Sequence, residues 1–314
     1  MIAIGIDIGG TSIKGAAIDS EGKVYETFSM PVIKGEPGVI TLRKLAASVK
    51  DYIARFNLGK DLIGIGIGCP GTLDVFNGVV EYSNNLGWNQ LHVAGIMGEI
   101  LPYHIRLIND ANAAALGEAK FGAGKEYSNI IMLTLGTGVG GGIIINGKLY
   151  EGNLGKAGEL GHVVIEVDGK QCTCGRKGCL EAYASATALI RDTKKAMLEN
   201  KDSLLWKLCP DMDDIGARIT FDAAKQGDPT AMKLIDNYVK YLGEGILNYC
   251  NIFRPEAIVL SGGVANAGYF LFDKLNQYVK ERNYGYQSTP EVKILPAKLG
   301  YDSGKIGAAA LFFG

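Results

Sequence analysis

Several features that would place a chain outside the globular cytoplasmic proteins are missing from this sequence. No apolar run approaches the about 20 residues of a membrane-spanning helix, and the N-terminus, MIAIGIDIGG, lacks the basic and apolar regions of a signal peptide. An excess of one charge is missing too, because 32 Lys and Arg are balanced by 33 Asp and Glu, whereas nucleic-acid binders usually carry a basic surplus. We therefore expect a cytoplasmic protein with no nucleic-acid partner and no membrane partner.

Composition also excludes disorder and a disulfide scaffold. Hydrophobic residues make up 47% of the 314 residues and charged residues 21%, which is not the composition of a disordered chain. Six cysteines are too few to cross-link a chain of this length, and three of them crowd between residues 172 and 179, which favours a metal site. At about 150 residues per domain, the length favours two domains.

Two segments of the chain resemble each other. Residues 6–25 (IDIGGTSIKGAAIDSEGKVY) and 134–150 (TLGTGVGGGIIINGKLY) each contain a strand, a Gly/Thr turn, a second strand and a polar turn. The polar turn of the second copy, Asn146-Gly147, is a strong hairpin signal. Two copies predict a duplicated α/β unit, with a cleft between the copies and a glycine turn from each facing it.

The rest of the chain alternates between strand and helix patterns, which is typical of an α/β protein. Strands are expected at 2–6, 16–18, 62–68, 105–108, 130–135, 143–145, 257–261 and 292–295. Helices are expected at 38–57, 111–121, 229–253, from the glycine turn at 262 to about 282, and from 303 onward. Pro229 stands where the first residue of a helix belongs, and the apolar stripe behind it is interpreted as core.

The first group of chemically active residues follows the first expected strand and consists of Asp7, Gly9, Gly10, Thr11 and Lys14. Glycines let backbone N–H groups approach an anion closely, so the group resembles a phosphate loop. A tight hairpin with a surface acid and a surface base explains this one turn equally well.

The second copy of the turn favours the phosphate interpretation. There Thr137 offers a hydroxyl and Gly138 an unhindered amide, and two such cradles suit a nucleotide triphosphate. A third turn, Gly262 and Gly263, follows a strand and precedes a helix, where adenine or ribose could lie against exposed backbone.

Asn109 and Asp110 stand where a strand ends and a helix begins. Taken alone, Asp110 fits a helix-capping carboxylate better than a catalytic one. However, phosphorylation of an alcohol needs a carboxylate near the hydroxyl to orient it and take its proton, and Asp110 could do so. Asn109 offers both donor and acceptor groups, which suits the hydroxyls of a sugar.

The most specific signal is a set of metal-ligand residues: His162, Cys172, Cys174 and Cys179. One imidazole and three thiolates are the usual composition of a structural zinc site. The spacing C-x-C-x₄-C departs from the usual C-x₂-C, so a disulfide or free buried thiols remain alternatives; we favour zinc because the chain looks cytosolic. Glu159 and Glu181 bracket the set and could accept hydrogen bonds from substrate hydroxyls, or be ordinary surface acids.

An ordered series of motifs makes nearly the whole chain resemble the ROK family of sugar kinases, and within it the zinc-containing bacterial glucokinases. The motifs are DIGGTSIKG, PGTLD, NNLGW, NDANAAALGE, LGTGVGGG, ELGH, CTCGRKGCLE, LSGGV and DSGKIGAAAL. The resemblance implies an actin-like ATPase (ribonuclease H-like) fold of two duplicated α/β domains with a cleft between them. The smaller domain would be 1–120 plus 301–314, and the larger 121–300, including the zinc loop.

The resemblance also implies an activity in carbohydrate metabolism. The expected reaction is ATP-dependent phosphorylation of a hexose, with glucose converted to glucose 6-phosphate as first choice. The expected cofactors are ATP, Mg²⁺ and structural Zn²⁺, and the expected assembly is a homodimer. The alternatives are a kinase for N-acetylmannosamine or another hexose or N-acetylhexosamine, and a non-catalytic sugar sensor.

Carried over position by position, the resemblance assigns a role to each candidate residue. Asp110 would be the general base and Asp7 would approach the metal and phosphate. The remaining roles are phosphate binding by Gly9, Gly10, Thr11, Lys14, Thr137 and Gly138, adenosine binding by Gly262 and Gly263, and sugar binding by Gly71, Asn85, Asn109, Glu159, His162 and Glu181. His162 would serve twice, with one ring nitrogen on zinc and the other toward a hydroxyl.

Overall fold

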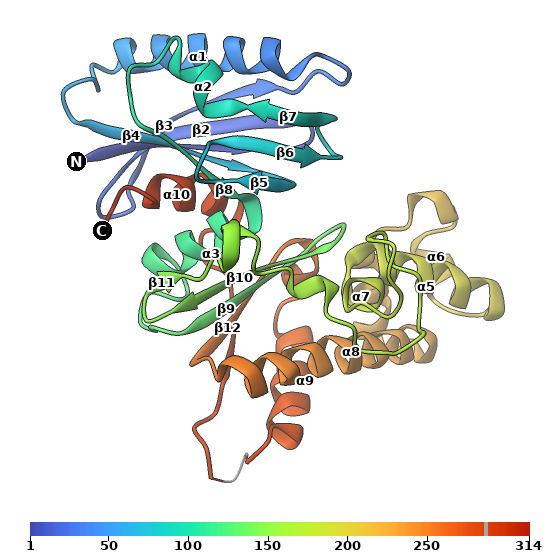
Figure 1. Ribbon diagram of the computed structural model, residues 1–314. Helices are drawn as coiled ribbons and strands as arrows, with labels where there is room; N and C mark the ends of the chain where they lie inside the picture. The colour runs from blue at the N-terminus through green and yellow to red at the C-terminus, as the bar shows by residue number, and fades with distance from the viewer. Residues whose placement is uncertain (286–287) are drawn as a thin grey trace. The chain divides into compact units, whose positions relative to one another are not determined.

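The computed structural model describes residues 1–285 and 288–314. Its strands form two five-stranded sheets and one three-stranded sheet, and helices alternate with them along the chain (Figure 1). Among the described residues, no helix combines the length and the apolar character needed to span a membrane.

The first five-stranded sheet contains the N-terminal repeat. Its strands are β1 (Ile2–Ile8), β2 (Ser12–Asp19), β3 (Val24–Pro31), β4 (Leu62–Cys69) and β8 (Ile105–Asn109), in the order β3-β2-β1-β4-β8. The pairs β1–β4 and β4–β8 are parallel, whereas the pairs β1–β2 and β2–β3 are antiparallel. The predicted strands at 2–6, 16–18, 62–68 and 105–108 all lie within this sheet.

Helices cover both faces of this sheet (Figure 1). Helices α1 (Gly38–Arg55) and α2 (Val93–Gly98) lie on one face, and α3 (Asp110–Phe121) and α10 (Ser303–Ala310) on the other. On the α1 side the core is aliphatic, and it includes Ile4, Ile6, Leu42, Leu45, Val49, Ile65 and Ile67. Each helix therefore buries an apolar face against a strand pattern that is apolar on both sides.

Glycines allow α10 to lie directly on the sheet. A Cβ atom added at Gly5 would lie 1.8 Å from the Lys305 carbonyl oxygen, and one at Gly66 would lie 1.9 Å from the Ala308 carbonyl oxygen. At Gly307 an added Cβ would lie 1.6 Å from the Ala113 carbonyl oxygen, so α10 and α3 are also in backbone contact. No larger residue fits at these positions without moving backbone, which accounts for part of the high glycine content.

A small antiparallel sheet lies in the stretch between β4 and β8. It consists of β5 (Thr72–Asp74), β6 (Val79–Ser83) and β7 (Trp88–His92) in the order β5-β6-β7. These strands were not predicted from the sequence, because they are short and lack a sustained apolar alternation. Gly71 directly precedes β5, and Asn85 lies in the turn between β6 and β7.

The second five-stranded sheet repeats the strand order of the first. Its strands are β9 (Ile130–Leu135), β10 (Val139–Ile145), β11 (Lys148–Leu149), β12 (Ala257–Ser261) and β13 (Lys293–Pro296), in the order β11-β10-β9-β12-β13. With β9 matched to β1, the two orders coincide strand for strand, as the sequence repeat predicts. Asn146 and Gly147 have φ values of 52° and 73° in the turn between β10 and β11, which confirms the predicted hairpin.

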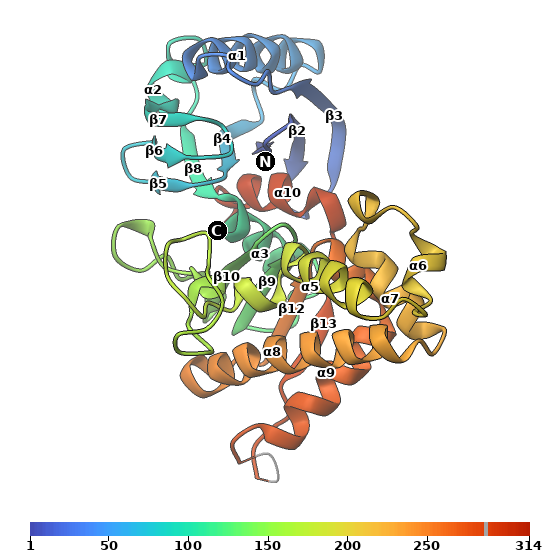
Figure 2. The same cartoon turned by 90° about the vertical axis from the view of Figure 1, so that its right-hand side faces the viewer.

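The helices after the second repeat are α4 (Glu181–Ala184), α5 (Ala186–Glu199), α6 (Leu205–Leu208), α7 (Ala217–Lys225), α8 (Pro229–Phe253) and α9 (Tyr269–Arg282). The long helix α8 begins at Pro229 as predicted, and the Asp228 carboxylate caps it by accepting a hydrogen bond from the Ala231 N–H at 2.7 Å. Its apolar stripe is buried as core, and α9 packs beside it (Figure 2).

The packing groups the residues into two compact units. Unit 1 comprises Met1–Ser128, Gly142–Gly158 and Lys298–Gly314, and unit 2 comprises Asn129–Gly141 and Glu159–Ala297. Unit 1 thus holds the first sheet, the small sheet and helices α1–α3 and α10, whereas unit 2 holds the predicted metal ligands and helices α4–α9. The domain boundaries expected at 120 and 300 stay a prediction.

Candidate active site

The carboxyl ends of three parallel strands place two acids at one edge of the first sheet. Asp7 pairs with Gly68 across β1 and β4, and Cys69 pairs with Asn109 across β4 and β8. Asp110 follows Asn109 directly as the first residue of α3. Ligand sites in open α/β sheets occur at such carboxyl ends, so unit 1 gathers Asp7, Asn109 and Asp110 where a substrate would bind.

The cap of α3 is Asn109. Its side-chain oxygen accepts hydrogen bonds from the Ala111 and Asn112 N–H groups at 3.0 and 3.3 Å, and its amide nitrogen donates to the Gly71 carbonyl oxygen at 3.4 Å. Asp110 also accepts a hydrogen bond from the Ala111 N–H, at 2.9 Å. The capping role left open for Asp110 is therefore filled by its neighbour.

Burial disfavours the ionised form of both carboxylates, and the charge of Asp110 adds to this at Asp7. Burial, with the charge of Asp110 adding to it, raises the pKa of Asp7 to about 6, although Lys14 and Lys305 act in the opposite direction. Asp110 is exposed as a whole residue. Burial of its carboxyl group nevertheless raises the pKa of Asp110, although the hydrogen bond from the Ala111 N–H lowers it. Burial and both acids likewise raise the pKa of the Cys69 thiol. Such a pair favours a proton or a cation between or beside the carboxylates.

The first glycine turn (residues 9–11) lies beside these acids. It is closed by a hydrogen bond from the Gly9 N–H to the Ser12 carbonyl oxygen at 3.0 Å, and Gly10 and Thr11 are exposed. Lys14 is the register partner of Asp7 on β2. Gly10 also faces Asn85, because a Cβ added at Gly10 would lie 3.9 Å from the Asn85 Cβ atom. The predicted residues of unit 1 therefore gather around one sheet edge.

The start of α10 also lies at this edge of the sheet, although no role was predicted for it from the sequence. A Cβ atom added at Gly304 would lie 2.9 Å from the Asp7 carboxyl carbon, so only glycine admits the carboxylate there. Lys305 is 5% exposed and pairs with Asp302. The signal available in the sequence was the motif DSGKIGAAAL, whose glycine and lysine have no meaning until the helix is placed against β1.

The second glycine turn (residues 136–138) lies in unit 2 and is held from several sides. The Gly136 N–H donates to the Gly138 carbonyl oxygen at 3.0 Å, and the Thr187 hydroxyl donates to the Thr137 carbonyl oxygen at 2.8 Å. The Thr137 residue itself is exposed. Gly262 lies alongside with φ of +89°, and a Cβ added there would lie 2.4 Å from the Leu135 carbonyl oxygen. The two predicted nucleotide turns of unit 2 are thus neighbours.

The four predicted metal ligands form one cluster. The ligand atoms of His162, Cys172, Cys174 and Cys179 all lie within 4.8 Å of one another. The Cys174 and Cys179 Sγ atoms are 3.7 Å apart, and the His162 Nδ1 atom is 3.6 Å from the Cys172 Sγ atom. A tetrahedral zinc ion with ordinary bond lengths separates two sulfurs by about 3.8 Å and a sulfur and a nitrogen by about 3.6 Å. The cluster therefore has the dimensions of a Cys₃His zinc site.

The segment around His162 packs against the start of β10. A Cβ atom added at Gly161 would lie 2.0 Å from the Val139 carbonyl oxygen. From the other side, the Glu181 Oε2 atom accepts a hydrogen bond from the Val139 N–H at 3.0 Å. The segment that carries His162 and the Glu181 carboxylate, both predicted to bind sugar, therefore meet at Val139. The exposed Glu159 lies one short helical turn before His162.

Comparison with known proteins identifies the family. The sequence model described as "ROK family" matches residues 3–314. The chain belongs to the ROK family. A glucokinase of Thermotoga maritima is 36% identical over 310 residues, which cover 98% of this chain and 96% of that protein. A xylose repressor of Bacillus subtilis is 31% identical, over 98% of this chain and 76% of the repressor. A solved structure that matches this chain is the crystal structure of a ROK family glucokinase from Streptomyces griseus in complex with glucose and AMPPNP. The two sequences are 33% identical, the TM-score is 0.81, and the match covers 99% of both chains.

These matches confirm the resemblance to the ROK family and the predicted actin-like ATPase fold with its two α/β parts. The fold rests on more than the comparison, because both five-stranded sheets have the same strand order. The roles of individual residues stay predictions, although each of the two units gathers its own predicted residues.

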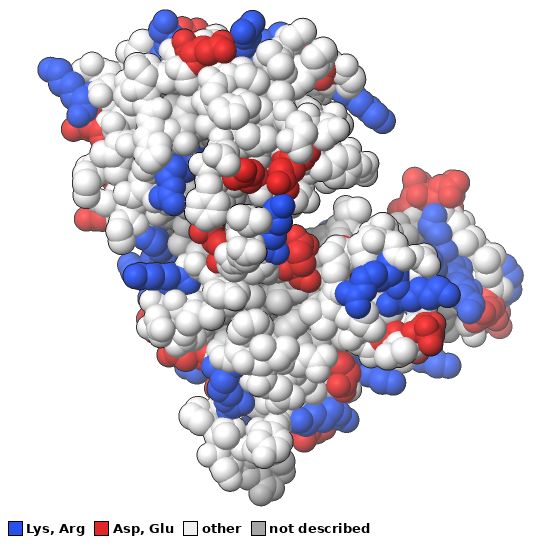
Figure 3. Space-filling view, viewed as in Figure 1, with Lys and Arg blue, Asp and Glu red and all other residues white. Residues whose placement is uncertain are grey.

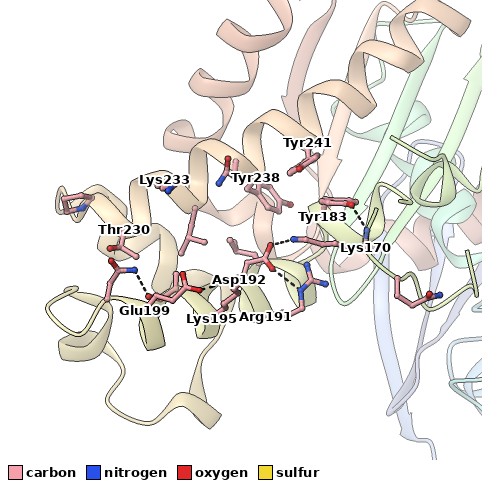
Figure 4. Close-up of a pocket in the computed structure, with 17 residues that line it drawn as sticks. Lys170, Tyr183, Arg191, Asp192, Lys195, Glu199, Thr230, Lys233, Tyr238 and Tyr241 are labelled. Carbon is pink, nitrogen blue, oxygen red and sulfur yellow. Dashed lines mark hydrogen bonds and ion pairs between the residues drawn. The ribbon is translucent and has the colours of Figure 1, made fainter. Parts of the chain in front are cut away.

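A groove of this ROK protein borders the metal cluster on the side of Gln171 and Tyr183. It has a volume of about 930 Å³ and runs between α5 and α8 (Figure 4). Its charged lining is basic on balance, with Lys170, Arg191, Lys195 and Lys233 against Asp192 and Glu199. Asp192 pairs with Lys170 at 2.7 Å and with Arg191 at 3.0 Å. The Lys170 ammonium also covers the Tyr183 ring at 4.9 Å from its centre. None of the predicted site residues lines this groove.

Replacing Asp7 with Asn should flatten the dependence of stability on pH. The folded protein holds a proton on Asp7 up to about pH 6, whereas the ordinary pKa of 3.8 means that the unfolded chain has lost it. The folded state therefore binds more protons between about pH 4 and pH 6, and wild-type stability falls as the pH rises through that range. In urea unfolding, the gain of the Asp7→Asn variant over the wild type should be about 1 kcal/mol larger at pH 8 than at pH 5. An equal gain at both pH values would contradict the raised pKa.

Replacing Cys174 with Ser should release the metal. Serine keeps the size of the side chain but is a poor zinc ligand, and a structural zinc site needs all four ligands. Elemental analysis of the purified protein should find one zinc per chain in the wild type and far less in Cys174→Ser. The matched control is Cys209→Ser, whose thiol donates to the Asp211 carbonyl oxygen away from the cluster and should not affect metal content. Equal zinc in all three proteins would refute the ligand set.

Proposed function

We propose that this protein is an ATP-dependent hexose kinase that converts glucose to glucose 6-phosphate. The observation that carries the proposal is Asp110: an acid at the carboxyl end of a central strand, relieved of the capping role, with a raised pKa and a second acid beside it. The similarity to named glucokinases over nearly the whole chain supports the same reaction.

Asp110 is proposed to act as the general base. Its carboxylate would accept the proton of the sugar 6-hydroxyl while the hydroxyl oxygen attacks the γ-phosphorus of ATP in line and ADP departs. A raised pKa suits this role, because a stronger base takes the proton more readily as long as it remains ionised. The Ala111 hydrogen bond holds one of its oxygens in place, which fixes the direction of the other.

The nucleotide is proposed to bind the glycine turns. In unit 1, Gly9, Gly10, Thr11 and Lys14 would hold phosphate oxygens, and in unit 2, Thr137 and Gly138 would do the same through unhindered N–H groups. The adenosine would lie at Gly262 and Gly263, where a Cβ added at Gly263 would meet no atom within 4 Å. Asp7 would hold Mg²⁺, which supplies positive charge to the phosphates when bound.

The sugar is proposed to bind through amide, carboxylate and imidazole groups. Each hydroxyl of a hexose both donates and accepts hydrogen bonds. The carboxylates of Glu159 and Glu181 would accept them, and the amides of Asn85 and Asn109 would both donate and accept. Gly71 has a φ of +114°, and the nearby Tyr82 carbonyl oxygen leaves no room for a side chain there. The backbone at Gly71 would therefore be bare where the sugar ring approaches it. His162 has its Nδ1 atom in the metal cluster, which leaves the Nε2 atom for a hydroxyl.

A sugar-sensing role without catalysis is the second candidate. The observation that favours it is the 31% identity to a xylose repressor over 98% of this chain. A sensor would bind sugar without turning over ATP, so turnover separates the two candidates. An N-acetylhexosamine kinase remains the closest alternative among enzymes, because the same groups could bind such a sugar.

We also propose that the protein binds zinc, forms a homodimer and lies in the cytoplasm. It is not expected to bind nucleic acid. On the face seen in Figure 3, acidic and basic side chains are interspersed over most of the surface, and basic side chains gather over part of the helical region of unit 2. The near-zero net charge of −1 supports small-molecule substrates rather than a polyanion.

A panel of sugars tests the proposed reaction. With Mg·ATP in a coupled ADP assay, kcat/KM for glucose should exceed that for N-acetylmannosamine, N-acetylglucosamine, allose and fructose by at least about tenfold, the discrimination expected from a few hydroxyl contacts. A preference for an N-acetylhexosamine would move the substrate assignment to that class. No turnover with any sugar, together with measurable sugar binding, would favour the sensor.

Replacing Asp110 with Asn should remove turnover while leaving sugar binding. Asparagine keeps the shape but cannot take a proton, and positioned proton transfer contributes about 10²–10⁴-fold. We expect kcat for glucose to fall by at least about 100-fold, with the dissociation constant for glucose within threefold by calorimetry. Asp51→Asn, on the exposed face of α1, is the matched control. Residual activity within about tenfold of wild type would rule out Asp110 as the base.

A further inference from the structure

The Glu181 carboxylate connects two segments that the sequence keeps apart. Its Oε1 atom accepts a hydrogen bond from the Thr173 hydroxyl at 2.9 Å, within the metal loop (residues 172–179). Its Oε2 atom accepts the Val139 N–H at 3.0 Å, directly after the second glycine turn. The Cys172 thiol also lies 3.6 Å from Oε1. Both oxygens are thus engaged, one toward the metal loop and one toward the glycine turn.

The contact with the glycine turn is tight. A Cβ atom added at Gly138 would lie 2.3 Å from the Glu181 Oε2 atom, so the carboxylate lies directly against the turn. A displacement of this carboxylate would therefore be felt directly by the turn. A hydrogen bond from a backbone N–H to an ionised carboxylate is also stronger than one to a neutral group.

The same stretch of chain holds the turn at two further points. The Ala186 N–H donates to the Gly136 carbonyl oxygen at 2.8 Å, and the Thr187 hydroxyl donates to the Thr137 carbonyl oxygen at 2.8 Å. Residues 181–187 thus carry three separate hydrogen bonds to residues 136–139. The Ala186 and Thr187 bonds depend on α5, but the Glu181 bond also depends on Thr173 for its direction.

We propose that Thr173 is a positioning residue for the nucleotide, acting through Glu181 on the second glycine turn. Its hydroxyl holds Glu181 so that the Val139 N–H is engaged and Gly138 keeps the shape that receives a phosphate. Thr173 lies between two predicted metal ligands, Cys172 and Cys174, so the metal loop fixes where this hydroxyl is. The metal loop then governs nucleotide affinity as well as the sugar pocket. This inference rests on the proposed kinase function.

Thr173 offers a cleaner test than Glu181. Glu181 is a proposed sugar residue, so changing it would alter sugar and nucleotide together. Thr173 is exposed and has no proposed contact with either substrate. Thr173→Val keeps the branched shape and removes the hydroxyl, Thr173→Ser restores a hydroxyl, and Thr230→Val, on α8 away from the turn, is a control for the loss of a threonine hydroxyl elsewhere.

The measurement is the dissociation constant of Mg·AMPPNP, determined by calorimetry on the zinc-loaded protein without sugar, followed by KM values for ATP and glucose. We expect Thr173→Val to bind the nucleotide about 5- to 10-fold more weakly, as the loss of one charge-assisted hydrogen bond implies. Its KM for ATP should rise by a similar factor while its KM for glucose changes less than twofold and its zinc content stays at one per chain. Thr173→Ser and Thr230→Val should both bind as the wild type does.

Three results would overturn the inference. Nucleotide affinity unchanged in Thr173→Val would show that the turn does not need the hydroxyl. Equal weakening in Thr173→Val and Thr173→Ser, or zinc lost from Thr173→Val, would assign the effect to the fold of the loop rather than to the hydrogen bond. Absence of sugar phosphorylation by the wild type is a different result: it contradicts the proposed function, whereas the sugar-free binding measurement still decides the role of Thr173.

Discussion

The repulsion between two partly buried carboxylates is the constraint on which the candidate site depends. Asp7 and Asp110 each raise the energy of the ionised pair, and burial raises it further. A fold selected only for stability would separate these groups or neutralise them, yet Lys14 and Lys305 offset the cost at Asp7 only in part. The sheet nevertheless holds both acids at the same edge, at the ends of two strands that are separated only by β4. A cation or a proton bound beside the carboxylates would relieve this unfavourable charge.

Close backbone packing is what makes this arrangement rigid. Helix α10 meets β1 and β4 at glycines, and its first turn meets the Asp7 carboxylate at Gly304. Helix α3, which carries Asp110, meets α10 at Gly307. The buried Glu118 carboxylate, at the far end of α3, accepts the Lys298 and Leu299 N–H groups at 3.1 and 2.7 Å and so fixes the segment that leads to α10. The two acids are therefore held by one connected set of backbone contacts in unit 1.

The sequence predicted what is local or repeated, and it missed what is created by distant contacts. The repeat predicted both sheets, because each copy carries its own strand, turn and strand, and Asn146-Gly147 predicted its hairpin from two residues. The metal-ligand cluster could be predicted from one histidine and three cysteines crowded in a short stretch, although their C-x-C-x₄-C spacing departs from the usual one. By contrast, β5–β7 are too short to show a pattern, and Gly304 gains its meaning only when α10 lies on β1. The competition between Asn109 and Asp110 for the cap was also undecidable locally, because both side chains are good caps.

Val139 shows why the residue-by-residue assignment of roles is incomplete. Its carbonyl oxygen lies against Gly161, next to a metal ligand, and its N–H is bound by Glu181, which the metal loop also contacts. A proposed sugar residue, the metal loop and the proposed phosphate turn thus share contacts with one valine. A sugar bound to the Glu181 carboxylate would draw on the same group that accepts the Val139 N–H directly after the glycine turn. Under the proposed roles, sugar and nucleotide binding would therefore be coupled within unit 2 through this carboxylate.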